Sequence, residues 1–423
     1  MYVARSEIPM TNITAPIGRS LNWRIPIVMV LSGCLISVLT FGPRSSLGLF
    51  LTPLSQANGW GRDVFSLAIA IQNLLWGVGQ PFAGAIADKF GAPRVLSAGA
   101  ALYALGLYLT ATASEPGALY FSAGVLVGFG LSGCAVPAVI GALSKLLPTS
   151  WGAIAFGAVT AAGSFGQFLF SPLAVHFQNT YGWQNALVIF SCLLLIVIPL
   201  SLMLIAPRQP ANASSAALPS QSLTQALAEA FGHRSYNLLV LGFFTCGFQL
   251  AFVTAHLPSY LVDRGLSVEV GGWTLAIIGL FNIIGSLGSG YLATIMPKRY
   301  ILSFIYSVRA LSIVAFILLP ASATATLIFG AVTGLLWLST VPPTSGLVAL
   351  MFGTRWLTML FGFAFFSHQV GGFLGVWLGG LVFERTGSYD AIWWLSVLFG
   401  VLSAIINLPI VEKPVARLAP AAA

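Results

Sequence analysis

Four ionisable side chains fall inside long apolar runs of this sequence, where a charge without a partner is costly. Arg309 and His368 lie near the middle of their runs, whereas Arg44 and His256 lie further along theirs. All 10 acidic residues fall between the runs or at their ends, so no carboxylate is placed to neutralise these cations. Helix carbonyls, water or an anionic ligand could compensate the charge instead.

Each of these four residues could bind a ligand or could serve only in packing, and the preferred interpretation differs among them. We expect Arg44 and His368 to contribute to a binding site, because the kink at Pro43 can turn Arg44 inward and polar residues flank His368. For Arg309 two interpretations stay open, a contact with a ligand or packing against helix carbonyls. His256 lies near the end of its run and is more typical of a satisfied histidine at an interface.

Side-chain amides inside the runs form a second set of candidates. Asn73, Gln167 and Asn282 could bind a polar ligand or could bridge neighbouring helices, which is the commoner use of such residues. There is no recognisable nucleophile motif and no G-x-x-x-x-G-K-[ST] loop, and the 4 cysteines form no CxxC pair. We therefore expect no catalysis, no cofactor and no metal site.

A charged loop follows the second apolar run and reads GAIADKFGAPR. Its glycines allow helix ends to approach closely, and its charges can cap helix ends or pair across a gap between helices. Such contacts can form in one conformation and break in another, which predicts a gating loop. The residues assigned to it are Gly84, Asp88, Lys89, Gly91 and Arg94.

Membrane-spanning helices must position these residues. The chain of 423 residues is 57% hydrophobic and only 7% charged, far from the composition of soluble proteins. A span takes roughly 20 apolar residues as a helix, because its backbone groups must be satisfied within the segment. Twelve stretches qualify, at 24–51, 64–84, 95–113, 118–145, 152–173, 185–206, 236–262, 269–293, 300–320, 323–350, 356–382 and 388–410.

Basic residues distinguish the two ends of these predicted helices. The formal charge of +8 comes from single Lys and Arg residues scattered between the runs, which argues against nucleic acid as a partner. With the N-terminus in the cytoplasm, thirteen of them fall on that side, and only Arg62, Arg264 and Arg385 fall outside. This inner excess predicts that both termini are cytoplasmic.

The two halves of the chain repeat each other. Pro137 and Pro343 are 206 residues apart, and Trp151 and Trp356 are 205 apart. A constant offset is the signature of a duplicated six-helix unit, with a ligand site expected between the halves. We therefore predict an all-α polytopic membrane protein whose twelve transmembrane helices form two pseudo-symmetric six-helix bundles. The predicted parts are an N-terminal bundle, a cytoplasmic linker with a short surface helix, and a C-terminal bundle, at 1–206, 207–235 and 236–423.

The loop from Gly84 to Arg94 resembles the G-x-x-x-D-[RK]-x-G-x-x-[RK] loop of the major facilitator superfamily, in the place where that family carries it. The copy in the second half keeps its glycine, Gly290, and its bases but lacks the acid. FGPRSSLGLF, GWGRD, AGSFGQ and GFQLAFVTAHLPSYL are similar to segments of bacterial members of the monocarboxylate and oxalate porter branch. The resemblance spans nearly the whole chain and implies the major facilitator fold.

One position departs from that branch, whose members carry Asn or Asp in the eighth helix and, four residues later, an arginine that binds the substrate carboxylate. Here Asn282 matches, but Ser286 stands in place of the arginine. The resemblance implies a small organic anion such as a monocarboxylate as the substrate. The serine leaves a neutral or aromatic solute open, such as riboflavin or a drug.

The function that these observations favour is secondary active transport by alternating access in the cell inner membrane, by a protein acting as a monomer. The expected partners are a small-molecule substrate and the lipid bilayer. Protons are a further candidate partner, with His368 as the mid-depth group able to exchange them near neutral pH. A membrane sensor or enzyme without transport activity is the alternative of another class. Direction of transport and mode of coupling are left open.

Overall fold

The computed structural model describes residues 26–147, 149–205 and 221–418, and every regular element within them is helical, as predicted. The first half contains α1 (Pro26–Ser46), η1 (Leu47–Phe50), α2 (Leu51–Asn58), α3 (Arg62–Phe90), α4 (Ala92–Ala111), α5 (Pro116–Leu119), the π-helix η2 (Tyr120–Leu126), α6 (Val127–Cys134), α7 (Val136–Leu146), α8 (Thr149–Leu195) and α9 (Val197–Leu202). The second half contains α10 (Leu223–Gly232), α11 (Arg234–Asp263), α12 (Val268–Ile295), α13 (Lys298–Leu318), α14 (Ala323–Leu336), α15 (Val341–Phe352), α16 (Leu357–Thr386), α17 (Asp390–Asn407) and η3 (Ala416–Leu418).

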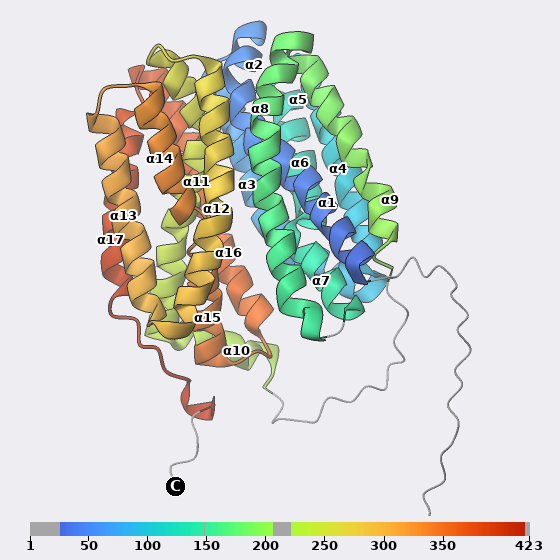
Figure 1. Cartoon of the computed structure of the whole chain (residues 1–423), viewed down its shortest axis with the longest axis vertical. Coiled ribbons are helices and arrows are strands. Elements are labelled where there is room, and N and C mark those ends of the chain that lie inside the picture. The colour runs from blue at the N-terminus through green and yellow to red at the C-terminus, as the bar shows by residue number, and fades with distance from the viewer. Residues whose placement is uncertain (1–25, 148, 206–220, 419–423) are drawn as a thin grey trace, which may run out of the picture.

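Ten helical stretches of the described chain are long and apolar enough to cross a membrane, so the predicted number of twelve is not fully confirmed by this measure. The predicted span at 64–84 lies in α3, which is helical but is not among the ten. The predicted spans at 152–173 and 185–206 both fall in the single stretch formed by α8 and α9. Gly182 breaks α8 with a φ of 82°, a value that favours glycine, and in Figure 1 the chain turns back after the first part of this helix.

The short helix expected in the segment 207–235 is present as α10. Ser222 precedes it and accepts a hydrogen bond from the backbone N–H of Gln225, while the Gln225 side chain accepts one from the backbone N–H of Ser222. This reciprocal capping box explains where the helix begins. Residues 206–220 of the predicted linker lie outside the described part of the chain.

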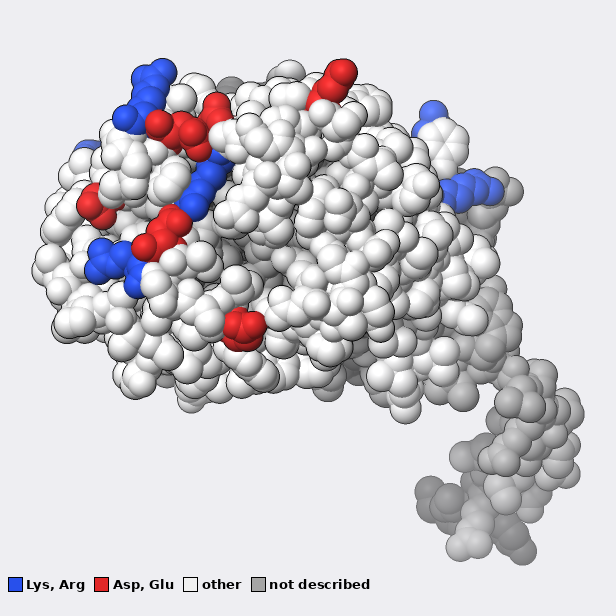
Figure 2. All heavy atoms as spheres, turned by 90° about the horizontal axis from the view of Figure 1, so that it is seen from above, with Lys and Arg blue, Asp and Glu red and all other residues white. Residues whose placement is uncertain are grey.

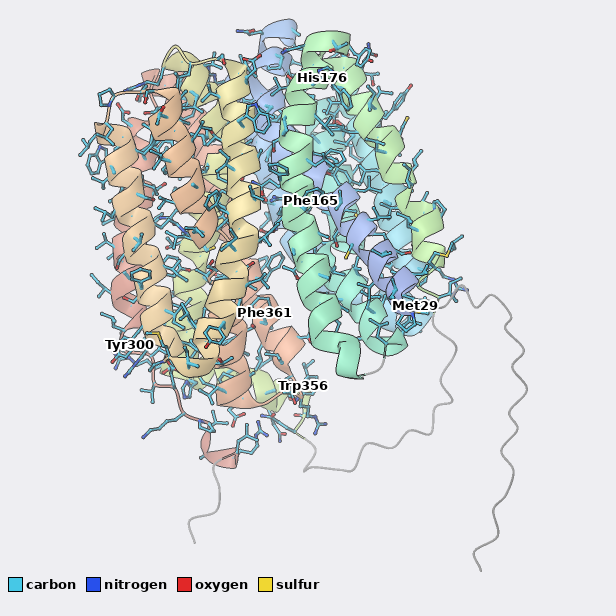
Figure 3. All side chains as sticks on the ribbon, viewed as in Figure 1. Met29, Phe165, His176, Tyr300, Trp356 and Phe361 are labelled. Carbon is cyan, nitrogen blue, oxygen red and sulfur yellow. The ribbon has the colours of Figure 1, made fainter. Side chains whose placement is uncertain are left out.

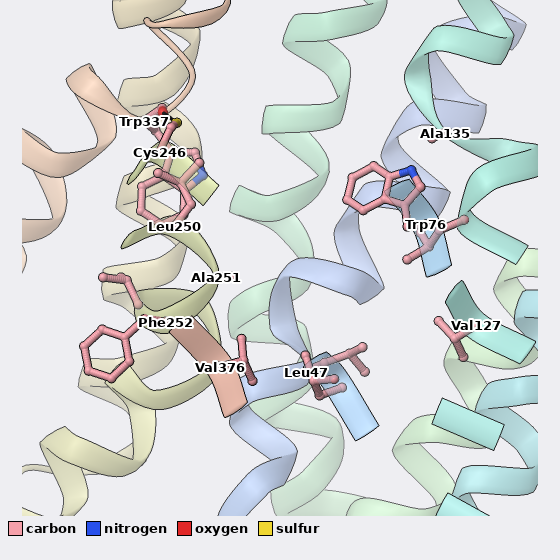
Figure 4. Packing of buried hydrophobic residues seen from close by; sticks show 14 of the residues in the cluster. Leu47, Trp76, Val127, Ala135, Cys246, Leu250, Ala251, Phe252, Trp337 and Val376 are labelled. Atoms are coloured by element: carbon pink, nitrogen blue, oxygen red, sulfur yellow. Dashed lines mark hydrogen bonds between the residues drawn. The ribbon is translucent and has the colours of Figure 1, made fainter. Parts of the chain in front are cut away.

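The helices form two groups that stand side by side in Figure 1, α1 to α9 in one and α11 to α17 in the other. Within the groups α1 packs along α8 and α11 packs along α16, and between them α3 packs along α16 and α8 along α12. Both groups contribute to one continuous cluster of buried apolar side chains. Figure 4 shows part of it, with Cys246, Leu250 and Trp337 from the second group and Trp76 and Val127 from the first.

Small residues allow the helices to approach closely. A Cβ atom at Gly247 on α11 would overlap the main-chain carbonyl of His368 on α16. A Cβ at Gly48 in η1 would likewise overlap the carbonyl of Thr254 on α11, across the boundary between the two groups. Glycine at such contacts lets backbones meet where a larger side chain would separate them.

The two ends of the molecule differ in how the groups of helices meet. We call them the Arg62 end and the Phe90 end, because α3 begins at one and finishes at the other. In Figure 1 the groups lie close together at the upper, Arg62 end and diverge toward the lower, Phe90 end. Figure 3 places Phe165 at mid-height in the first group and Trp356 at the lower end of the second.

Candidate functional site

Arg44 lies in the last turn of α1, directly after the proline inside that helix. Its Nη2 donates a hydrogen bond to Oδ1 of Asn73 on α3 at 2.7 Å, and the carbon of its guanidinium lies 4.5 Å from the centre of the Trp76 ring. The Nε–H of Arg44 is buried and has no hydrogen-bond partner in the part of the chain that the structure describes. Residues of α3 therefore hold the half-buried Arg44 side chain. One N–H donor of its guanidinium remains unused.

Tyr103 on α4 supplies a second buried donor near Arg44. Its side chain is fully buried, its hydroxyl has no hydrogen-bond partner among the described residues, and it lies close enough to Arg44 to interact electrostatically. Buried polar groups in native proteins are usually bonded, so both donors are available to an acceptor that the described residues do not supply. A carboxylate offers two acceptor oxygens. From the sequence, Tyr103 could line a cavity or simply pack inside its apolar run, which is the commoner use of such aromatic residues.

Hydrogen bonds connect this region of α1 and α3 with α16 in the other group of helices. The main-chain oxygen of Asn73 accepts from Nε2 of Gln369 at 3.2 Å, and Oε1 of Gln369 lies 3.1 Å from Nδ1 of His368. The His368 ring stacks on Phe365 with centroids 5.8 Å apart, and Phe365 meets Trp76 edge-on at 5.4 Å. The structure thus brings together three of the predicted site residues, Arg44, Asn73 and His368.

Gln167 and Asn282 lie apart from that cluster, where α8 packs along α12. Nε2 of Gln167 donates to the main-chain oxygen of Leu275 at 3.0 Å, and Nδ2 of Asn282 donates to Oγ of Ser164 at 2.8 Å. Oδ1 of Asn282 also accepts from the backbone N–H of Leu338 at 2.9 Å. Both amides therefore bridge helices, which is one of the two roles that the sequence left open.

Arg309 on α13 is also apart from that cluster, and its side chain is only 1% exposed. Its Nη2 donates to the main-chain oxygens of Leu336 and Trp337, and Nη1 donates to Oε1 of Gln249 at 3.2 Å. No described residue bonds its Nε. The two carbonyls lie where α14 ends and before α15 begins, so the guanidinium satisfies oxygens that the helix break leaves free. This placement supports the packing interpretation of Arg309.

Arg62 binds the second group of helices through a network of hydrogen bonds and an ion pair that the sequence did not predict. Its Nη1 and Nη2 lie 2.6 and 2.7 Å from the carboxylate oxygens of Asp263, and its backbone N–H donates to Oε1 of Glu384 at 2.6 Å. Nη1 also donates to the hydroxyl of Tyr389 at 3.1 Å, and that hydroxyl lies 3.3 Å from Nδ1 of His256. Figure 2, which looks down on this end, shows acidic and basic side chains close together. The motif GWGRD signalled only a family likeness, not these partners.

The predicted gating loop lies at the Phe90 end, between α3 and α4. Gly91 has a φ of 93°, which favours glycine and lets α4 begin directly after α3. Arg94 donates through Nη1 to a carbonyl in the last turn of α3 at 3.0 Å, and Lys89 Nζ lies 5.3 Å from the neighbouring aromatic ring. A Cβ at Gly84 would meet no atom within 4 Å. The side chain of Asp88 lies outside the described part of the structure, so the latch stays a prediction.

Comparison with known proteins identifies the family. Residues 33–376 match the sequence model of the Major Facilitator Superfamily. The chain belongs to this superfamily. It is 29% identical over 387 residues to the uncharacterized MFS-type transporter YcxA of Bacillus subtilis, covering 88% of this chain and 92% of that one. It is 26% identical over 394 residues to monocarboxylate transporter 13 of Rattus norvegicus, covering 90% and 87% respectively.

Solved structures of the superfamily share the fold over nearly the whole chain. A D-xylose-proton symporter superposes with a TM-score of 0.72 at 15% identity and covers 92% of this chain and 98% of its own. A bacterial homolog to the human lysosomal transporter Spinster, in an inward-facing and occupied conformation, gives a TM-score of 0.71 at 14% identity, with coverage of 89% and 95%. The predicted resemblance is confirmed, and the protein is a multi-pass membrane transporter rather than an enzyme.

Proposed function

We propose that this transporter moves a small organic monoanion, such as a monocarboxylate, through a site formed around Arg44. The observation that carries the proposal is the pair of buried donors without partners, Nε of Arg44 and the hydroxyl of Tyr103. A carboxylate bound there would accept from both groups and would neutralise the guanidinium charge, which a neutral amide and an aromatic ring compensate only in part. The likeness to a rat monocarboxylate transporter supports the same class of substrate.

The charge of the proposed substrate follows from the number of cations that it can reach. Arg309 is buried against the carbonyls of a helix break and is not accessible to a solute. Ser286, which stands where related porters carry an arginine, donates its hydroxyl to the main-chain oxygen of Asn282 one turn earlier. Of these three positions, Arg44 supplies the permanent positive charge of the site, and one such charge is matched by one carboxylate.

We further propose that transport is secondary and runs by alternating access. The bundles predicted at 1–206 and 236–423 would rock about the contacts of α3 with α16 and of α8 with α12. The inner excess of Lys and Arg supports an orientation in the inner membrane with both termini in the cytoplasm, and the protein would act as a monomer. Two hydrogen bonds join the groups of helices at these contacts. Gln369 donates to the main-chain oxygen of Asn73, and Asn282 donates to Ser164, so the groups would rotate about these bonds.

A neutral aromatic solute is the second candidate, and the aromatic surroundings of Arg44 favour it. The guanidinium lies over the Trp76 ring and 5.9 Å from the centre of the Phe41 ring, and Phe365 contacts Trp76 from the other group of helices. Such rings can stack on a planar solute such as riboflavin. In that case Arg44 would serve as a polar contact rather than as a counter-ion.

Uptake into liposomes reconstituted with the purified protein tests the proposal with three labelled probes, namely pyruvate, malonate and riboflavin. We expect pyruvate to be taken up, malonate to be taken up much less, and Arg44→Gln to lower the apparent affinity for pyruvate by at least about tenfold. The matched control is Arg385→Gln, which removes an exposed arginine from the last turn of α16 and should leave pyruvate uptake unchanged.

Three results would overturn this proposal. Riboflavin uptake without pyruvate uptake would select the neutral solute. Equal pyruvate affinity in Arg44→Gln and the native protein would remove Arg44 from the site. Thermal stabilisation of the protein by pyruvate without any flux would indicate a sensor, because a ligand that binds the folded state raises its stability whether or not it is transported.

A further inference from the structure

Arg62, at the start of α3 in the first group of helices, engages three segments of the second group at once. Its guanidinium pairs with Asp263 at the end of α11 and donates to Tyr389 at the start of α17, while its backbone N–H donates to Glu384 on α16. The guanidinium carbon also lies 4.0 Å from the centre of the Phe383 ring. We propose that Arg62 is the gating residue of the Arg62 end, the clamp that must release its partners before the site opens on that side.

Within the clamp, Arg62 is largely shielded from water, while Asp263 remains partly accessible to it. The side chain of Arg62 is 15% exposed and that of Asp263 is 32% exposed, and the pair is bidentate. Charge-assisted bidentate bonds are stronger than neutral hydrogen bonds, and screening by salt weakens with burial. Separating the two groups of helices at this end therefore requires this ion pair to break.

Tyr389 and His256 connect the clamp to the interior of the second group. The phenolic hydroxyl of Tyr389 carries its proton near neutral pH and can both donate and accept a hydrogen bond. Nε2 of His256 lies 2.9 Å from the main-chain oxygen of Val376, an acceptor that requires a proton on Nε2 and leaves Nδ1 free to accept. The Tyr389 hydroxyl can then donate to His256 while its oxygen accepts from Arg62. The bond to His256 thereby orients the Tyr389 hydroxyl so that its oxygen accepts the hydrogen bond from Arg62.

Other contacts across the boundary place the closed side of the molecule at the same end. Oγ1 of Thr52 and Oγ of Ser259 lie 2.9 Å apart, and Asn179 donates to Glu269 at 3.2 Å. Toward the Phe90 end the two groups of helices diverge in Figure 1. The clamp therefore closes the Arg62 end in the conformation described here. The inference rests on the alternating-access mechanism proposed above but not on the identity of the solute.

Spin-label distances at the Arg62 end test the clamp without any substrate, so the result does not depend on whether the proposed solute is correct. Labels are attached at Gln56→Cys on α2 and Thr324→Cys on α14, two exposed positions in opposite groups of helices. Cys34 and Cys192, the cysteines with exposed surface, are first replaced by Ser. The ratio of short to long distances then reports how far the Arg62 end is closed.

We expect Arg62→Gln to lower this ratio about tenfold, because the ion pair is lost. The exchanged variant Arg62→Asp with Asp263→Arg should restore most of the closed population, which distinguishes a gating role from a simple folding defect. Arg264→Gln is the matched control, since Arg264 lies beside Asp263 but stacks on Tyr260 of its own helix. An unchanged ratio in Arg62→Gln, no recovery in the exchanged pair, or equal opening in Arg264→Gln would each overturn the proposal.

Discussion

Among single residues, the buried arginines show how the same side chain can serve two purposes. Arg309 donates to two main-chain oxygens and to Gln249, and it is almost wholly removed from solvent. Arg44 is half-buried, and its bond to Asn73 leaves a buried Nε–H unpaired. Loss of a cation that supports main-chain carbonyls at a helix break costs stability, whereas loss of one that binds a ligand costs ligand affinity. The two residues therefore fail in different ways when they are replaced.

His368 is the residue on which we expect any proton coupling to depend. Histidine exchanges protons near neutral pH, and His368 lies at mid-depth on α16, joined through Gln369 to the main chain of Asn73 beside Arg44. His368→Gln should abolish the stimulation of pyruvate uptake by an inward pH step. Counterflow of the solute should be spared, because it requires no net proton movement. Accumulation of pyruvate against its gradient by this variant, driven by the pH step, would assign the proton to another group.

At the level of helices, breaks and close contacts decide how the elements are supported. Helices α14 and α15 are separated by a break whose free carbonyls are satisfied by Arg309 from α13. Helix α8 turns back at Gly182, and α11 meets α16 at Gly247, where no larger residue fits without a shift of the backbone. These features link neighbouring helices within each group, so that each group can move as a unit.

The support of the helix break predicts a stability defect that is separate from transport. Arg309→Met preserves much of the side-chain length but leaves the carbonyls of Leu336 and Trp337 without their donor, at a cost of about 2 to 4 kcal/mol. We expect a lower thermal unfolding midpoint for the detergent-purified variant and near-normal pyruvate affinity in the fraction that stays folded. A normal midpoint combined with lost affinity would instead make Arg309 a solute contact.

For the molecule as a whole, the two ends differ in the contacts that can hold the groups of helices together. The Arg62 end is joined by the ion pair with Asp263 in the conformation described here. The Phe90 end carries the predicted gating loop, with Gly91 in a conformation that favours glycine and Arg94 bonded to the end of α3. Alternating access requires that the contacts at one end form while those at the other end break.

Replacing the acid of the gating loop should alter the rate of the conformational change rather than binding. If Asp88 latches the Phe90 end when that end closes, Asp88→Asn destabilises the closed arrangement there and slows exchange between the inward- and outward-facing states. We expect net pyruvate uptake to fall several-fold, with little change in the dissociation constant measured by equilibrium binding. Weaker binding with an unchanged maximal rate would contradict the latch.

Local properties of the sequence were enough to establish that the chain is a helical membrane transporter with a repeated architecture. The bilayer requires each spanning segment to be apolar and of a certain length, and it biases where Lys and Arg fall, so these features can be read from one segment at a time. The loop from Gly84 to Arg94 is likewise a contiguous motif. The same local information left the number of spans uncertain. Amides and charges lower the apolarity of α3, and a single glycine separates the two parts of α8.

Which polar residues meet was decided only by the tertiary structure. Asn73 lies 29 residues from Arg44 and 296 from Gln369, and Arg62 lies 201 residues from Asp263. A residue's position in an apolar run gives its depth, but the packing of distant helices determines whether it faces a donor, an acceptor or lipid. For that reason Gln167 and Asn282, which looked equivalent to Asn73 in the sequence, bridge α8 and α12, while Asn73 alone of the three holds Arg44.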